Sequence, residues 1–144
     1  MNTGILLITH STFGEVLIQN VSHILGKRPA DLNPLGVFPE ANPDEVLKLS
    51  SPLINLMHKK HNCSQILILT DLFGATPSNI TQKLLQKYQN AKNIKIKAVS
   101  GLSLPMLLKV IFYRNQNEDN KETELEQLCQ KAIQAVCDGT KIYE

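Results

Sequence analysis

The sequence has no strong charge of either sign, no long apolar run and few cysteines. Its 144 residues carry 15 Lys and Arg against 13 Asp and Glu, a net charge of +2, and 5% of them are aromatic. These numbers exclude a strongly basic nucleic-acid-binding protein. No apolar run reaches the roughly 18 residues that span a bilayer, and no charged segment precedes the first one, so we expect a cytoplasmic protein. Cys63, Cys129 and Cys137 are odd in number and widely spaced, which indicates free thiols.

Several familiar motifs are also missing. The chain has no G-x-S-x-G, which argues against a Ser-His-Asp hydrolase. It has neither a P-loop nor a G-x-G-x-x-G, yet a nucleotide- or flavin-binding module remains an alternative that a thermal-shift assay with those ligands would test. His58, His61 and Cys63 form H-x2-H-x-C, but no second paired motif follows to complete a zinc site. We expect no metal and no cofactor.

Strand and helix patterns alternate along the whole chain. The spacing predicts one α/β domain over 1–144, with a mostly parallel central sheet of order 2-1-3-4, helices on both faces and a short C-terminal edge strand. The two all-apolar runs, Ile5–Ile8 and Ile66–Leu69, should be central neighbours. The predicted strands cover 5–8, 35–38, 66–69, 94–99 and the surroundings of Ile142; the predicted helices cover 13–25, 43–57, 76–88, 105–112 and 125–136, with a polar loop over 114–120.

The first predicted helix has a candidate cap and a one-sided apolar face. Thr12 and Glu15 have the spacing of a capping box, so the Thr12 side chain should cap the helix. Its apolar residues fall on one face, which should pack against the sheet: Phe13, Val16, Leu17, Val21, Ile24 and Leu25. His23 lies on the same helix, and we interpret it as a packing residue.

Polar residues follow the two central strands. In an open parallel sheet the ligand site lies beyond the carboxyl ends of the strands, where the strand order reverses. Since adjacent strands are about 4.8 Å apart, His10 and Asp71 should lie within hydrogen-bond reach there. If the Asp71 carboxylate holds Nδ1–H, the Nε2 lone pair of His10 faces outward and becomes more nucleophilic.

The residues around this pair suggest the electrophile. His10 precedes one helix N-terminus, and the segment Gly74-Ala75-Thr76 precedes another, so unpaired N–H groups and two positive dipole ends should meet there. Hydroxyl donors add to them from Ser11, Thr12, Thr76 and Ser78. A nucleophilic nitrogen beside a phosphate cradle points to a phosphohistidine. The same Ser, Thr and Asp residues are also common helix caps, so from the residues alone a purely structural role stays open.

Three segments together resemble a known family. Ile8-Thr-His10-Ser, Thr70-Asp71-Leu-Phe-Gly-Ala-Thr-Pro-Ser-Asn79 and Ser100-Gly101-Leu-Ser-Leu-Pro105 resemble the IIA domain of the mannose/fructose/sorbose class of the bacterial phosphoenolpyruvate-dependent sugar phosphotransferase system. The resemblance implies that His10 accepts a phosphoryl group on Nε2 from the phosphorylated histidine carrier protein and passes it to a IIB partner. It further implies a homodimer and contact with the membrane only through a permease. Since the sequence shows no cluster of carboxylates for a metal, we expect direct in-line transfer between histidines.

The resemblance also assigns roles to the residues near His10. Asp71 orients the imidazole, and Ser11, Thr12, Gly74, Ala75 and Thr76 bind the phosphoryl oxygens. The wall of the site comprises Phe73, Ser78, Ser100, Gly101 and Ser103. Phe73, Ala75 and Thr76 replace the Trp, Gly and Ser that the family often has, and Ser78 replaces a common Phe. The chain has no attached IIB domain, so a stand-alone regulatory IIA protein is an alternative, as is an interaction protein without phosphoryl chemistry.

Overall fold

The computed structural model describes residues 2–116 and 124–144, and within them four parallel strands form one sheet of order β2-β1-β3-β4. β1 (Asn2–His10) and β3 (Cys63–Thr70) are the central pair, with β2 (Leu32–Val37) and β4 (Lys95–Ser100) at the edges. This order confirms the prediction. The residues at 5–8 and 66–69 are fully buried, because helices cover both faces of the two central strands.

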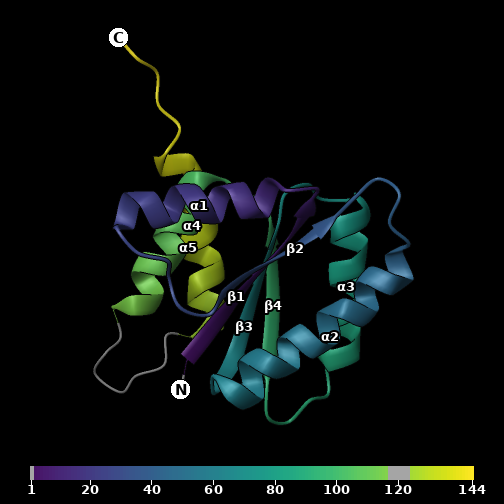
Figure 1. Cartoon of the computed structure of the whole chain (residues 1–144). Coiled ribbons are helices and arrows are strands. Elements are labelled where there is room, and N and C mark those ends of the chain that lie inside the picture. The colour runs from purple at the N-terminus through teal and green to yellow at the C-terminus, as the bar shows by residue number, and fades with distance from the viewer. Residues whose placement is uncertain (1, 117–123) are drawn as a thin grey trace.

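The helices form two layers around the sheet (Figure 1). α1 (Phe13–Leu25), α4 (Leu104–Asn115) and α5 (Leu125–Asp138) cover one face, and α2 (Pro43–Lys60) and α3 (Thr76–Tyr88) cover the other. All four strands point their carboxyl ends to the same edge, where His10 pairs with Val37 and Thr70 pairs with Ser100. Part of the predicted polar loop, 117–120, lies outside the described residues.

Two predictions from the sequence are wrong, one about the C-terminal tail and one about the buried face of α1. No strand forms around Ile142; the tail extends away from the body, and Ile142 and Tyr143 are 88% and 102% exposed. Among the described residues no strand pairs with the tail. The apolar face of α1 is also rotated from the predicted one: Leu17 and Val21 are buried, together with Gly14 and Ile18, whereas four apolar residues point to solvent, namely Phe13, Val16, Ile24 and Leu25. The small Gly14 sets this rotation, because it lets α1 approach Leu7 and Thr9 of β1 closely.

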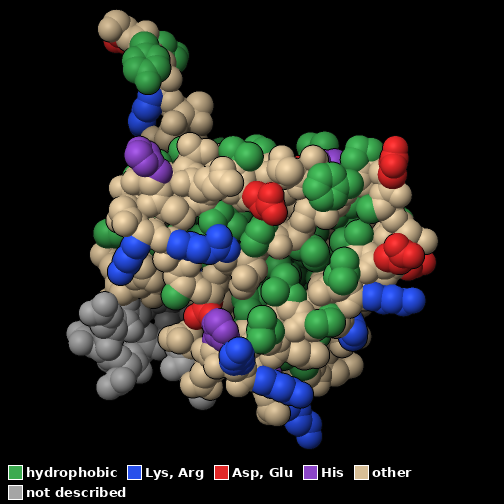
Figure 2. Space-filling model, viewed as in Figure 1, with side chains coloured by type: hydrophobic (Ala, Val, Ile, Leu, Met, Phe, Trp, Pro, Cys, Tyr) green, Lys and Arg blue, Asp and Glu red, His purple; other side chains and the backbone are tan. Residues whose placement is uncertain are grey.

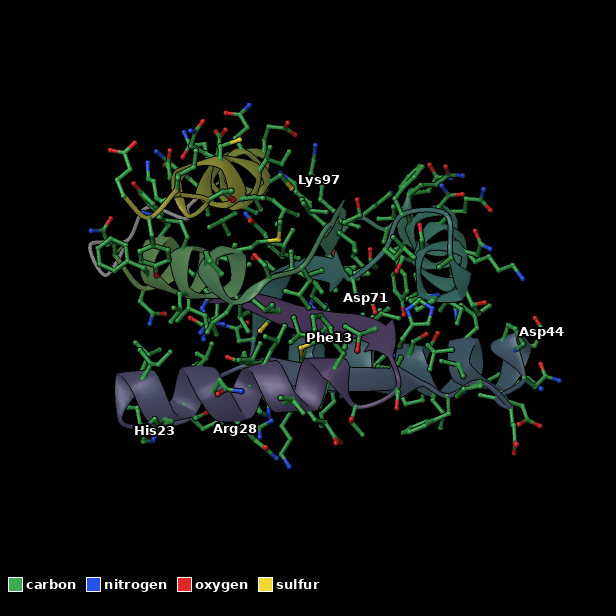
Figure 3. The ribbon with its side chains drawn as sticks, turned by 90° about the horizontal axis from the view of Figure 1, so that it is seen from above. Phe13, His23, Arg28, Asp44, Asp71 and Lys97 are labelled. Atoms are coloured by element: carbon green, nitrogen blue, oxygen red, sulfur yellow. The ribbon has the colours of Figure 1, made fainter. Side chains whose placement is uncertain are left out.

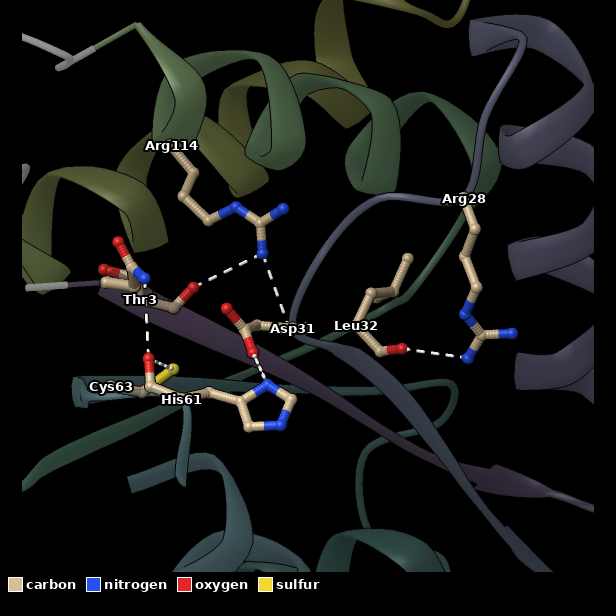
Figure 4. Close-up of polar contacts among 8 residues, drawn as sticks. Thr3, Arg28, Asp31, Leu32, His61, Cys63 and Arg114 are labelled. Atoms are coloured by element: carbon tan, nitrogen blue, oxygen red, sulfur yellow. Dashed lines mark hydrogen bonds and ion pairs between the residues drawn. The ribbon is translucent and has the colours of Figure 1, made fainter. Parts of the chain in front are cut away.

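Two arginines anchor the amino end of β2 (Figure 4). Arg114, at the end of α4, donates through Nη1 to the carbonyls of Thr3 at 3.3 Å and Asp31 at 3.5 Å. Arg28 donates through Nη2 to the carbonyl of Leu32 at 3.1 Å and is exposed. Burial lowers the pKa of Arg114, while the negative charge of Asp31 opposes that shift. Arg114 therefore joins α4 to β1 and β2 across one end of the sheet.

Arg114→Met should destabilise the fold more than the matched change Arg28→Met. Removing the partly buried guanidinium deletes its hydrogen bonds to the carbonyls of Thr3 and Asp31, although the Asp31 carbonyl still accepts from Ile5 N–H, and should cost about 1–3 kcal/mol. Arg28 is exposed, so its loss should cost less than about 1 kcal/mol. The free energy of unfolding in urea measures both. Equal losses for the two variants would contradict the anchoring role of Arg114.

Candidate active site

His10 and Asp71 meet at the carboxyl end of the sheet. His10 is the last residue of β1, and Asp71 directly follows β3. Nδ1 of His10 lies 2.8 Å from Oδ2 of Asp71, and the same oxygen accepts a hydrogen bond from the backbone N–H of His10 at 2.9 Å. The expected contact is therefore present. One carboxylate oxygen holds both the main chain and the ring of His10, which fixes the direction of the imidazole.

This contact also decides which ring nitrogen is free. An ionised carboxylate only accepts hydrogen bonds, so Nδ1 carries the hydrogen and Nε2 keeps its lone pair. The side chain of His10 is 50% exposed, and that of Asp71 is 14% exposed. The other oxygen of Asp71, Oδ1, is buried and has no hydrogen-bond partner in the described part of the chain. The imidazole of His10 is thus half exposed, with Nδ1 held by Asp71.

The turn after His10 differs from the predicted capping box. The Thr12 side chain makes no capping hydrogen bond; instead Oγ1 of Thr9 accepts from the N–H of Gly14 at 2.9 Å. Thr12 has φ −91° and ψ 8°, not the extended conformation from which a cap side chain folds back onto the helix. Sequence reasoning missed Thr9 because a buried threonine at the end of a strand carries no capping signal.

Two more helices begin at the same edge. Gly74 and Gly101 have φ values of +86° and +85°, a conformation that suits glycine, and they turn the chain from β3 and β4 toward α3 and α4. α3 has no side-chain cap, so its first N–H groups are open to an anion, while Ser103 caps α4 by accepting from Met106 N–H at 3.3 Å. An open groove begins at Thr76 and runs between Pro43 and the outer face of α3.

The residues assigned to the site from the sequence differ in exposure. Ser11, Thr12, Gly74 and Thr76 are exposed and Ala75 is partly exposed, so all five of the proposed phosphate-binding residues are accessible to a ligand. Among the proposed wall residues Phe73 and Gly101 are exposed, Ser100 and Ser103 are half-buried, and Ser78 is buried. Little of Ser78 is therefore left to line an open site. Leu102, which follows Gly101, is buried in the core.

A second histidine–carboxylate pair lies at the opposite end of the sheet (Figure 4). Nδ1 of His61 is 2.6 Å from Oδ1 of Asp31, and the exposed fractions of the two side chains are 45% and 9%, close to those of His10 and Asp71. The pair itself therefore does not identify a phosphate site. His61 stands at the C-terminus of α2, after Lys59 and Lys60, where the negative end of the helix dipole favours an imidazolium and disfavours an anion. His10 lies among helix N-termini, whose positive dipole ends favour an anion and disfavour an imidazolium.

The remaining histidines and the cysteine motif do not form a metal site. Nδ1 of His58 contacts the carbonyl oxygen of Cys63 at 2.8 Å, and the ring of His61 is held by Asp31. Burial, with the nearby charge of Asp31, raises the pKa of Cys63 to about 11, so its thiol stays protonated at neutral pH. Within the described residues no three His, Cys, Asp or Glu side chains gather to hold a metal. His23 is exposed near the far end of α1 (Figure 3).

Comparison with known proteins places this arrangement in a family. Residues 4–136 match the family model EIIA-man, described as the PTS system fructose IIA component. The chain belongs to this family. Like its relatives in the EIIA-man family, it is a component of the phosphotransferase system. No helix in the described residues has the length and apolar character needed to cross a membrane.

Individual relatives agree with the EIIA-man assignment. The PTS system sorbose-specific EIIA component of Lacticaseibacillus casei is 29% identical over 111 residues, which cover 77% of this chain and 73% of that protein. The phosphotransferase system component EIIA of Streptococcus agalactiae has the same fold, with a TM-score of 0.76, 24% identity and coverage of 97% and 96% of the two chains. The PTS IIA protein associated with the fucose utilization operon of Streptococcus pneumoniae follows at a TM-score of 0.72 and 21% identity, covering 94% and 91%.

Asp71→Ala should change the tautomer of His10. Free imidazole side chains favour the hydrogen on Nε2, and the Asp71 carboxylate holds it on Nδ1 in His10. We expect ¹⁵N shifts of the rings at mildly alkaline pH to show Nδ1–H for His10 and His61 in the wild type. In Asp71→Ala only His10 should move toward Nε2–H, and in Asp31→Ala only His61. An unchanged His10 ring in Asp71→Ala would contradict the orienting contact.

Proposed function

We propose that this chain, as one cytoplasmic domain, carries a phosphoryl group on Nε2 of His10. The donor is the phosphorylated histidine carrier protein, and the acceptor is a IIB component in sugar uptake and phosphorylation. The observation that carries the proposal is the contact of Asp71 with both N–H groups of His10, which leaves Nε2 unprotonated and facing outward. Membership of the EIIA-man family supports the phosphotransferase role.

The proposed step is an in-line displacement at phosphorus. The Nε2 lone pair of His10 forms a bond to phosphorus as the P–N bond to the donor histidine breaks, and the electron pair of that bond returns to the donor nitrogen. No proton has to move at Nε2 in the forward step, because Asp71 already holds the ring hydrogen on Nδ1. The positive charge that the ring gains on phosphorylation lies beside the Asp71 carboxylate, which stabilises it.

The surroundings favour transfer to a protein over hydrolysis. The equatorial oxygens of the phosphoryl group would face the open N–H groups at the start of α3 and the hydroxyl of Thr76. A hydrolase needs a base placed to activate water. Asp71 does not serve as one, since Oδ2 is occupied twice by His10 and Oδ1 is buried. The phosphohistidine should therefore last until a partner histidine approaches.

Apolar side chains near His10 provide a surface for the partners. Phe13 follows His10 by three residues, Phe38 follows the residue paired with His10, and Leu72 and Phe73 follow Asp71; all four are exposed, Phe73 by 74%. Single exposed apolar residues are ordinary, but four around one exposed histidine form a contact area for a protein. Leu49 and Leu56 of α2 are exposed as well. Figure 2 shows further hydrophobic side chains at the surface.

Replacing His10 should abolish phosphorylation. With phosphoenolpyruvate, enzyme I and the histidine carrier protein, wild type should gain one acid-labile label, and His10→Ala none. Asp71→Ala should be labelled about 10- to 100-fold more slowly with its fold intact, because the ring is no longer held. His61→Ala is the matched control, since His61 has the same kind of carboxylate contact, and it should be labelled at the wild-type rate.

The outcomes also separate the candidate functions. Label that passes on to IIB supports the transport role, and label that stays on His10 with every IIB tested supports the regulatory alternative. An unlabelled wild type would contradict the proposal and favour an interaction protein without phosphoryl chemistry.

We further propose that the protein forms a homodimer through its C-terminal side. The outer edge of β4 is unpaired within the described chain, and α5 beside it exposes Ile133 and Val136. The exposed tail with Ile142 and Tyr143 would add as a strand to the sheet edge of a second copy. The opposite edge, β2, contains Pro34, which lacks a backbone donor and so suits a free edge.

Ile142→Asp should weaken the dimer. Burying an isoleucine side chain stabilises an interface by about 2 kcal/mol, so its loss should raise the dimer dissociation constant by roughly 30-fold. Sedimentation at several protein concentrations measures this constant. Leu49→Asp on α2, which is also exposed but lies on the other face of the sheet, should leave it unchanged. A monomeric wild type, or equal effects of the two substitutions, would overturn the assignment.

A further inference from the structure

The turn that follows His10 has an unusual backbone conformation. Ser11 has φ +47°, in the left-handed region that residues with a Cβ seldom occupy. Of the three non-glycine residues with positive φ in the described chain, Ser11 is the one beside His10; the other two, Asp31 and Asn62, lie at the opposite end of the sheet. Such a conformation persists only where neighbouring groups hold it.

The edge strand β2 contacts Ser11 at two points. The N–H of Ser11 donates to the carbonyl oxygen of Val37 at 2.9 Å. The carbonyl oxygen of Ser11 lies over Gly36: a Cβ placed on Gly36 would be 2.3 Å from it and 3.3 Å from the Ser11 carbonyl carbon. Both of these atoms belong to the backbone, so no side-chain rotation relieves the clash. The left-handed turn at Ser11 therefore requires a glycine at position 36.

The direction of one N–H group depends on this close approach. In a trans peptide the N–H points opposite to the C=O, and the described chain has no cis peptide. Since the Ser11 carbonyl points at Gly36 on β2, the N–H of Thr12 points away from β2. β1 lies between β2 and β3, and β3 leads to Asp71, which holds the ring. The Thr12 N–H has no acceptor among the described residues.

We infer that Gly36 is a positioning residue for phosphoryl transfer. It leaves room for the Ser11 carbonyl and so directs the Thr12 N–H toward an oxygen of the phosphoryl group on His10. The inference rests on the proposed function and adds a residue that neither touches the phosphoryl group nor follows a central strand. A glycine inside a strand pattern is itself a sign of close backbone approach.

Gly36→Ala tests the inference, with Gly4→Ala as the matched control. Both are strand glycines whose new Cβ meets a neighbour, but at Gly4 that neighbour is Sδ of Met57 at 3.0 Å, at the other end of β1. At saturating phosphorylated carrier protein we expect Gly36→Ala to be labelled about 10- to 100-fold more slowly, because the misplaced peptide no longer stabilises the transferring group. The carrier concentration at half-maximal rate should stay unchanged, and Gly4→Ala should keep the wild-type rate.

A spectroscopic signature separates positioning from a loss of stability. After complete phosphorylation the Thr12 amide proton should move downfield in wild type and Gly4→Ala, as an N–H that binds a phosphoryl oxygen does, and should not move in Gly36→Ala. If Gly36→Ala does not fold, Ser11→Val takes its place, because a β-branched residue disfavours the same left-handed turn without touching β2; Ser11→Ala controls for the lost hydroxyl.

The results distinguish the two proposals. A wild-type rate and a wild-type Thr12 shift in Gly36→Ala, or equal losses in Gly36→Ala and Gly4→Ala, would overturn the role of Gly36 while leaving the phosphocarrier function intact. A wild type that takes no label would refute the function first, before any variant is compared.

Discussion

The two hydrogen bonds that Asp71 accepts from His10 are the contacts on which the rest of the site depends. One carboxylate oxygen accepts from the backbone N–H and from Nδ1 of the same residue, at 2.9 and 2.8 Å, so the carboxylate is held by the His10 main chain and the ring cannot turn without breaking its hydrogen bond to Asp71. This geometry requires β1 and β3 to be neighbours that end at the same edge. The buried apolar runs of the two strands secure that pairing, and thereby link the core to the chemistry proposed for Nε2.

The two histidine–carboxylate pairs show that such a contact does not by itself identify a phosphate site. His10–Asp71 and His61–Asp31 are alike in distance, atoms and exposure. They differ in the helix ends that surround them. At His10 the N-termini of α1, α3 and α4 gather and favour an anion, while at His61 the C-terminus of α2 favours a cation. The parallel sheet separates these environments, because α1, α2, α3 and α4 each follow a strand and begin at its carboxyl edge, whereas α5 follows α4 and begins at the opposite edge.

Periodicity predicted the helices but not always the side that each one buries. On α1, six apolar residues on one face gave the direction of packing from hydrophobicity alone, yet Gly14 lets that helix approach β1 and leaves Phe13 and Val16 exposed. The tail at Ile142 had a strand pattern, but a strand needs a partner edge, and within a single chain the tail has none. Both errors concern contacts with something outside the segment itself, and both leave apolar groups available to other proteins.

The sequence by itself determined the order of the elements, the central pair of strands and the meeting of His10 with Asp71, because these follow from local apolar patterns and from the rule that parallel strands end together. Tertiary structure alone decided the left-handed turn at Ser11, the space above Gly36, the cap from Thr9 and the Asp31 contact of His61. These features depend on atomic distances between chain segments that are far apart in sequence. No pattern of residue types along one segment encodes such distances, whereas the packed sheet sets them to within tenths of an ångström.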